Sequence, residues 1–97
     1  MHTISMEVTW DPVKARSNAK KHGSSFPDAE AVFFDPFAIS TQDLGSIDEP
    51  RFVGIGMDSL RRVLVVVYIY RENTIRLISA RKANRVETRA YGKGIRL

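Results

Sequence analysis

Cysteine is absent from the 97 residues of this chain. That absence excludes a disulfide framework, a zinc or iron–sulfur site held by thiolates, and a thiol nucleophile. Because small secreted domains are usually stabilised by disulfides, we expect a cytoplasmic protein. Long apolar runs are lacking too. The longest, Val63–Tyr70, falls far short of the roughly 20 residues of a membrane-spanning helix, so no membrane contact is expected.

Motifs for metal and cofactor chemistry are also missing. The sequence holds no cluster of His, Asp and Glu at metal-ligand spacing, no H-E-x-x-H, no phosphate-binding loop and no G-x-S-x-G. A G-x-G does occur within residues 51–57, but neither a third glycine nor a predicted helix follows it, so it does not indicate a dinucleotide site. Any catalysis is therefore expected to need neither a metal nor a cofactor.

The charge of the chain is unevenly distributed. Fifteen basic and 11 acidic residues give a net charge of +4. Residues 1–50 hold four basic and eight acidic residues, a net charge of −4, whereas residues 71–97 hold eight basic and two acidic residues, a net charge of +6. A cationic end on a small domain is typical of proteins that bind nucleic acid or an acidic protein, although a solvated basic face has the same composition.

Length and hydrophobic patterning predict a single domain over residues 1–97. Strands are expected at 5–10, 37–41, 51–57, 62–70 and 74–80. Helices are expected at 12–22, between Ser25 and Pro36, and at 83–91. The strand at 62–70 is continuously apolar and is expected to be buried on both faces. The order β-α-α-β-β-β-β-α predicts an α+β fold with a mainly antiparallel sheet.

Local signals mark where the predicted helices begin and end. Asp11 and Pro12 are typical of a helix start, and Gly23 is typical of a helix end. Gly92 is expected to end the last helix in the same way. On the second predicted helix, four apolar side chains share one face and are expected to lie in the core: Phe26, Ala29, Val32 and Phe33.

The end of the first predicted helix carries Lys20, Lys21 and His22 directly before Gly23. Cations at a helix C-terminus interact favourably with the helix dipole, and this alone would account for them. The functional interpretation is that Lys21 and His22 face a shared anion site. Histidine transfers protons near neutral pH, and lysine is a point charge suited to phosphate.

Four arginines lie inside or beside the predicted strands: Arg51, Arg62, Arg76 and Arg81. An arginine among apolar residues usually needs a partner. Either it pairs with Asp48 or Glu49 in the acidic segment 42–50, or it lines a cleft that binds phosphate through both ends of the guanidinium. Strict alternation along the last strand places Arg76 and Arg81 on opposite faces of the sheet.

The last predicted helix carries a basic ridge, because Arg85, Arg89 and Lys93 are spaced four residues apart. Like charges at this spacing destabilise an isolated helix, so the ridge is expected to contact RNA phosphates or an acidic segment of a partner protein. Two further sets lie on the same helix: an apolar stripe of Ala83, Val86 and Ala90, and the pair Glu87 and Tyr91.

Taken together, these motifs resemble the BrnT family of bacterial type II toxins. The resemblance covers about residues 8–91 and rests mainly on three stretches in this order: Trp10-Asp11-Pro12, Lys21-His22-Gly23 and Arg76-Leu77-Ile78-Ser79-Ala80-Arg81. It implies a compact RelE-like fold, ribonuclease activity, and neutralisation by a BrnA-like antitoxin. Such antitoxins carry a ribbon-helix-helix domain, through which the complex would contact DNA and repress its own operon.

The resemblance also implies a set of site residues. The lysine and histidine of the K-H-G motif and arginines of the sheet are implicated in the toxicity of that family. In this sequence they correspond to Lys21, His22, Arg62 and Arg81, for which we expect catalytic roles. Four other arginines are expected to bind RNA: Arg51, Arg76, Arg85 and Arg89.

Two hypotheses follow. The first is a metal-independent endoribonuclease that inhibits translation. His22 would transfer a proton, and Lys21, Arg62 and Arg81 would stabilise the negatively charged phosphorane. The second acid–base group would be Tyr91 or Glu49. The alternative is a non-catalytic module, whose basic helix docks the antitoxin and which acts as a co-repressor.

Overall fold

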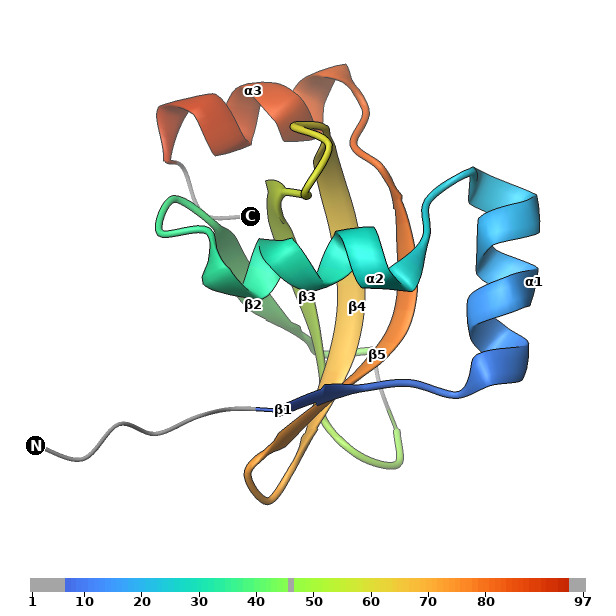
Figure 1. The fold of residues 1–97 in the computed structure, drawn as a ribbon. Helices are drawn as coiled ribbons and strands as arrows, with labels where there is room; N and C mark the ends of the chain where they lie inside the picture. The colour runs from blue at the N-terminus through green and yellow to red at the C-terminus, as the bar shows by residue number, and fades with distance from the viewer. Residues whose placement is uncertain (1–6, 46, 95–97) are drawn as a thin grey trace, which may run out of the picture.

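The computed structural model describes residues 7–45 and 47–94. Its elements are β1 (Glu7–Thr9), α1 (Pro12–His22), α2 (Phe26–Ala29), the 3-10 helix η1 (Glu30–Phe34), β2 (Ile39–Asp43), β3 (Arg51–Met57), β4 (Val63–Arg71), β5 (Thr74–Lys82) and α3 (Arg85–Lys93) (Figure 1). The α+β class and the predicted order of elements are confirmed. Residues 5 and 6 of the predicted first strand lie outside the described residues. In the described part of the chain, no helix is long and apolar enough to cross a membrane.

The five strands form one sheet in the order β1-β5-β4-β3-β2. Strands β2 to β5 pair in antiparallel fashion, but β1 pairs with β5 in parallel. The sheet is therefore mixed, and the prediction of a mainly antiparallel sheet is wrong. The reason is topological. The chain passes from β1 through the helices to β2 at the far edge, and the meander from β2 to β5 returns so that β5 runs alongside β1 in the same direction.

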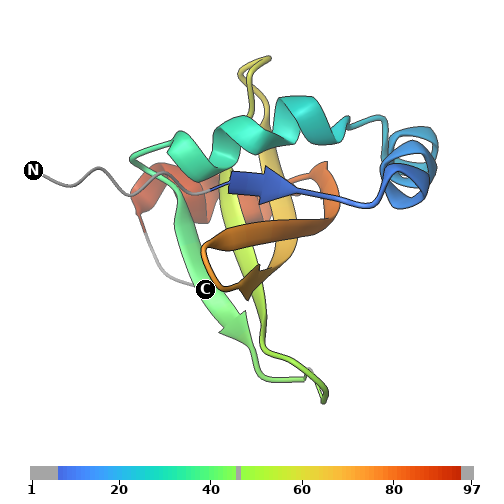
Figure 2. The ribbon, with the colours of Figure 1, turned by 60° about the horizontal axis from the view of Figure 1, so that its bottom comes forward.

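One face of the sheet is covered by α2 and η1 (Figures 1 and 2). The core on this face combines residues of these helices with alternate residues of β4 and β5: Phe26, Ala29, Val32, Leu64, Val66, Tyr68, Ile75, Leu77 and Ala80. Three of the four predicted core residues of the second helix are buried and Phe33 packs against them. Gly56 allows η1 to approach β3 closely, because a Cβ there would lie 2.8 Å from Cγ1 of Val32.

The opposite face of the sheet, called here the second face, is shaped by an irregularity in β5. Leu77 pairs with Tyr68 and Ser79 pairs with Val67, so Ile78 is an extra residue between two pairs. A bulge of this kind shifts the alternation by one residue. Arg76 and Arg81 consequently lie on the same face, opposite Ile69 and Val65. The prediction that strict alternation separates them is wrong.

The helix ends follow the predicted local chemistry, with one exception. Asp11 accepts a hydrogen bond from the Val13 N–H at 2.8 Å, and Gly23 ends α1 in the left-handed conformation with φ 70°. The last helix, however, continues past Gly92 and ends at Gly94, whose φ is 67°. The other bounds within the described residues lie within two residues of the predicted ones, with α2 and η1 together taking the place of the second predicted helix.

The orientation of α3 is set by polar contacts. Val86, the largest residue of the apolar stripe, is 74% exposed, while Ala83 and Ala90 are half-buried. Glu87 and Tyr91 point inward and make polar contacts with Arg81 and Asp35. Because polar contacts hold this helix in place, the spacing of its apolar residues does not predict which side of the helix is buried.

Candidate functional site

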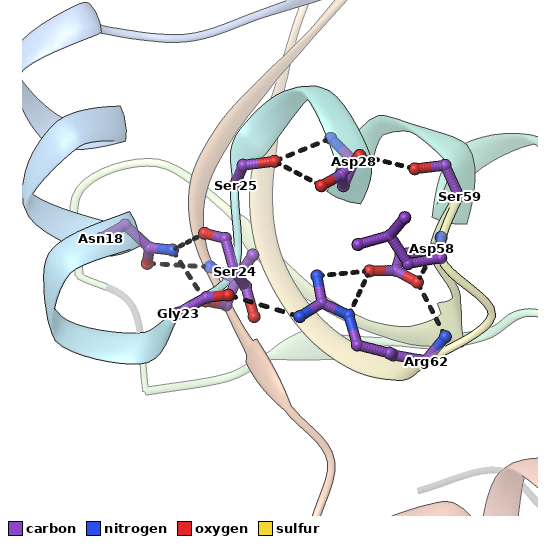
Figure 3. A network of polar contacts seen from close by, with 10 residues as sticks. Asn18, Gly23, Ser24, Ser25, Asp28, Asp58, Ser59 and Arg62 are labelled. Carbon is purple, nitrogen blue, oxygen red and sulfur yellow. Dashed lines mark hydrogen bonds and ion pairs between the residues drawn. The ribbon is translucent and has the colours of Figure 1, made fainter.

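The position of α1 is fixed by one buried amide. Among the residues that the structure describes, β1 pairs with Thr74, Ile75 and Arg76 and leaves the C-terminal part of the β5 edge open. Asn18 fills this gap: its Nδ2 donates to the Ala80 carbonyl at 2.8 Å, and its Oδ1 accepts from the Ala80 N–H at 3.1 Å. Nδ2 also donates to the Ser24 carbonyl at 3.0 Å (Figure 3). Asn18 therefore replaces a strand neighbour and holds α1 beside β5.

This arrangement creates a cavity of about 210 Å³ between α1 and β5, called here the α1 cavity. It is lined by five residues of α1 and two of β5: Lys14, Ser17, Asn18, Lys21, His22, Ile78 and Ser79. Lys21 is exposed and His22 is half-buried. Within residues 7–45 and 47–94, neither side chain makes a hydrogen bond or an ion pair. The ammonium group of Lys21 and the imidazole of His22 are therefore available to a ligand in the cavity.

Arg62 lies beside the turn that follows His22, outside the α1 cavity. Its Nη2 forms an ion pair with Asp58 at 2.8 Å, and its Nε donates to the same carboxylate at 2.9 Å. Its Nη1 donates to the Gly23 carbonyl at 3.3 Å (Figure 3). Asp58 is 4% exposed and also accepts from the N–H groups of Leu60 and Arg62. The guanidinium thus ties the end of α1 to the loop before β4.

Arg81 lies on the second face, two residues beyond Ser79 of the α1 cavity. Both terminal nitrogens donate to Glu87, each at 2.8 Å. The hydrogen bonds from Arg81 lower the pKa of the Glu87 carboxyl against the opposing effect of burial, and the same contact raises the pKa of Arg81. Glu87 also accepts from the Asn84 N–H in a capping box. Arg81 therefore joins β5 to the start of α3.

A larger cavity of about 540 Å³ lies on the second face and is called here the sheet cavity. Four of its lining residues are basic: Lys14, Arg51, Arg71 and Arg76. Three are acidic and come from β2 and the loop after it: Asp43, Asp48 and Glu49. Arg71 and Glu49 form an ion pair at 2.9 Å. Because Lys14 and Ile78 line both cavities, the two adjoin.

The predicted site residues are thus divided among several places. Lys21 and His22 share the α1 cavity, and Arg51 and Arg76 share the sheet cavity. Arg85 and Arg89 are exposed on α3 and line neither cavity. Lys14 was not among the predicted residues, although it lies seven residues before Lys21 and so on the same helix face. Arg71, the last residue of β4, also lines the sheet cavity, but no spacing in the sequence indicated it.

The two candidates for a second acid–base group lie elsewhere. The Tyr91 hydroxyl donates to Oδ2 of Asp35 at 2.7 Å and lines a separate cavity with Phe37. Burial and this hydrogen bond raise the pKa of Tyr91 to about 12. Glu49 is paired with Arg71 in the sheet cavity. The described ranges contain no group of three or more His, Asp or Glu side chains that could hold a metal ion.

Comparisons with known proteins bear directly on this geometry. A family model described as the ribonuclease toxin BrnT of type II toxin–antitoxin systems matches residues 10–87. The chain belongs to the BrnT family. The crystal structure of the Brucella abortus ribonuclease toxin BrnT has the same fold, with a TM-score of 0.62 and 24% sequence identity over 84% of this chain and 100% of that chain. No match is found among curated proteins.

Membership of the BrnT family confirms the resemblance drawn from the sequence. A ribonuclease toxin of a type II system implies an RNA target and an antitoxin partner. The match ends at Glu87, so it includes both cavities and the Arg81–Glu87 pair but only the first turn of α3. The RelE-like description of the fold stays a prediction.

Proposed function

We propose that this chain is a metal-independent endoribonuclease that acts in the cytoplasm, cleaves RNA at the α1 cavity and so inhibits translation. The observation that carries the proposal is the set of two lysines and one histidine in that cavity. Lys14, Lys21 and His22 line it together, and none of these side chains forms an ion pair with the residues described. Unpaired cations beside a proton-transfer group are what an RNA phosphate needs for cleavage.

The nucleophile would be the 2′-hydroxyl of the RNA itself. Its oxygen attacks the adjacent phosphorus while the bond from phosphorus to the 5′-oxygen breaks. The products are a 2′,3′-cyclic phosphate and a 5′-hydroxyl. One proton leaves the 2′-oxygen and one reaches the 5′-oxygen, so the reaction needs proton transfer and stabilisation of negative charge.

His22 would carry one of these proton transfers, because imidazole changes charge near neutral pH. Lys21 would stabilise the charge on the phosphorane from the same helix end. Arg81 would add positive charge from β5, on the face that carries Ser79 of the cavity. Arg62 would act through its hydrogen bond to Gly23 and is therefore a positioning residue.

The remaining arginines would bind the rest of the RNA. Arg51 and Arg76 would contact phosphates within the sheet cavity, since both line it. Arg85 and Arg89 would contact either RNA or the antitoxin from the exposed side of α3. The antitoxin itself would be BrnA-like, with a ribbon-helix-helix domain, and the complex would reach DNA only through that domain.

Growth inhibition in cells tests these assignments. Expression of the chain should arrest growth, and co-expression of its antitoxin should restore it. His22→Ala and Arg81→Ala should each abolish the arrest at matched expression, while circular dichroism shows a folded protein. Unchanged toxicity in both variants would refute the site, and loss of folding would assign the residue to the structure instead.

One observation favours the non-catalytic alternative. Two of the four expected catalytic residues are engaged by carboxylates, Arg62 by Asp58 and Arg81 by Glu87. A co-repressor needs such cations only for its structure. Folded protein that binds the antitoxin and operator DNA in complex, yet leaves RNA intact under all conditions, would establish this alternative.

A further inference from the structure

The sheet cavity is lined by basic side chains that have no part in the proposed cleavage step. Its four cations come from three strands and a helix, and they converge on one hollow of about 540 Å³. Arg71 is paired with Glu49. Arg51 and Arg76, by contrast, have no hydrogen bond or ion pair from their side chains in the described part of the chain. Two guanidinium groups without partners in one hollow indicate a ligand with phosphate groups.

The sheet cavity adjoins the α1 cavity but has its own cations, because Arg51 and Arg76 line only the sheet cavity and Lys21 and His22 line only the α1 cavity. Ser79 lines the α1 cavity and Arg76 lines the sheet cavity, three residues away along β5. At a strand rise of ~3.3 Å per residue this is at most about 10 Å. A stacked strand of nucleic acid advances about 3.4 Å per nucleotide, so the two cavities suit different nucleotides of one strand.

The lining also suits a single strand rather than phosphate alone. The half-buried Ile78 and the exposed Ile47 give the cavity an apolar surface on which a ribose or base can rest. Among the lining residues that the structure describes, the one ion pair is Arg71–Glu49. Both partners are exposed, with 60% of the Arg71 side chain and 43% of the Glu49 side chain accessible to solvent. Exposed pairs are weak, so a phosphate can take the place of Glu49 on Arg71.

We propose that the sheet cavity is a second subsite for single-stranded RNA, which holds the phosphate and nucleoside beside the cleaved nucleotide. Arg51 and Arg76 bind the phosphate, and Lys14 lies between the two cavities and contacts the linking backbone. This subsite rests on the proposed ribonuclease function, but it is defined by binding and can be tested without cleavage.

The test uses 2′-O-methyl oligonucleotides, which have no free 2′-hydroxyl and cannot be cleaved. Fluorescence anisotropy of the full chain should show at least a tenfold gain in affinity from two to four nucleotides. Arg51→Gln combined with Arg76→Gln should remove most of that gain. It should also reduce the slope of log affinity against log salt by about 1.4, since two contacts to single-stranded phosphate are lost.

Arg16→Gln is the matched control. Arg16 is an exposed cation of α1 that lines neither cavity, so its loss should leave the gain with length intact. A second measurement needs no variant. In methyl NMR spectra of the wild-type chain, the signals of Ile69 should move with the four-nucleotide ligand and stay in place with the two-nucleotide ligand.

Equal affinity for the two-nucleotide and four-nucleotide ligands would overturn the subsite. So would an Arg16→Gln variant that loses as much affinity as the double variant, or Ile69 signals that do not move with the four-nucleotide ligand. Failure of the function has a different signature. If longer ligands bind more tightly through Arg51 and Arg76 but no RNA is cleaved, the subsite stands and the ribonuclease proposal fails. If cleavage of RNA depends on His22 but affinity does not rise from two to four nucleotides, the subsite alone fails.

Discussion

Arg62 donates a hydrogen bond to the carbonyl oxygen of Gly23 at 3.3 Å, although 39 residues separate them in the sequence. The same guanidinium is held by the buried carboxylate of Asp58. This contact connects the loop before β4 to the residue that follows His22. The end of α1, with its two candidate catalytic side chains, is therefore fixed from two sides, by Asn18 at β5 and by Arg62.

Replacing Arg62 should damage both stability and cleavage. Arg62→Ala leaves Asp58 buried without its cation, and breaking such a pair should cost about 2–4 kcal/mol of unfolding free energy, measured by urea denaturation. Asp58→Asn in the same chain keeps Oδ1 for the N–H groups of Leu60 and Arg62 and should recover part of that loss. Arg62→Ala that is as stable as wild type would contradict the assigned role.

The Arg81–Glu87 pair predicts a pH dependence of stability. The pKa of Glu87 is lowered in the folded state, so between the lowered value and its ordinary value of about 4.3 the unfolded chain binds more protons. The pair therefore stabilises fully above about pH 4.3, and this contribution is lost as the pH falls through the folded pKa.

The difference in melting temperature between wild type and Glu87→Gln measures this contribution. It should be largest at neutral pH and shrink as the pH falls below about 4. Glu72→Gln, at the exposed turn between β4 and β5, provides the control with the same charge change. A Glu87→Gln difference that is constant across pH, or one that Glu72→Gln reproduces, would argue against the pair.

Tyr91 is expected to matter for stability and not for cleavage. Tyr91→Phe removes the hydroxyl that donates to Asp35 and leaves that carboxylate with its backbone donors, so it should cost about 1 kcal/mol. RNA cleavage should stay unchanged because Tyr91 does not line the α1 cavity. Loss of cleavage in a folded Tyr91→Phe variant would instead make Tyr91 the second acid–base group.

The local signals in the sequence predicted much of the fold. Asp11, Gly23 and Ser25 act on their own neighbours through hydrogen bonds and backbone conformation, so their effects can be read without knowing the tertiary structure. The parallel pairing of β1 could not be predicted in this way. It depends on how the chain crosses the sheet, and no residue of Glu7–Thr9 encodes a direction.

The site was harder to predict because its geometry depends on long-range contacts. Ile78 is apolar whether or not it forms a bulge. The sequence therefore could not predict that Arg76 and Arg81 lie on the same face of the sheet. Val86 continues an apolar pattern, but polar contacts of Glu87 and Tyr91 decide which way α3 turns. Lys14 could have been found, since helical spacing alone places it with Lys21.

The basic ridge on α3 should contribute to antitoxin binding. Arg85, Arg89 and Lys93 are exposed, and Val86 beside them adds an accessible apolar side chain. Arg85→Glu combined with Arg89→Glu should weaken antitoxin binding by at least about tenfold, or roughly 1.4 kcal/mol, with a strong dependence on salt. Calorimetry at low and high salt measures both effects.

Arg16→Glu combined with Lys20→Glu reverses the same number of exposed charges on α1 and serves as the control. It should weaken binding less than the change on α3. An affinity that is indifferent to salt and to the α3 substitutions would exclude an electrostatic contact there and favour an antitoxin that blocks the cavities through apolar contacts.

Analysis of the RNA ends produced in EDTA tests the central claim most directly. The purified, folded chain should cleave single-stranded RNA without any divalent metal and leave a 2′,3′-cyclic phosphate and a 5′-hydroxyl, identified by mass spectrometry. His22→Ala should be slower by at least about 100-fold, the usual contribution of a positioned proton-transfer group. Cleavage that requires added Mg²⁺, or that His22→Ala leaves unchanged, would contradict the account.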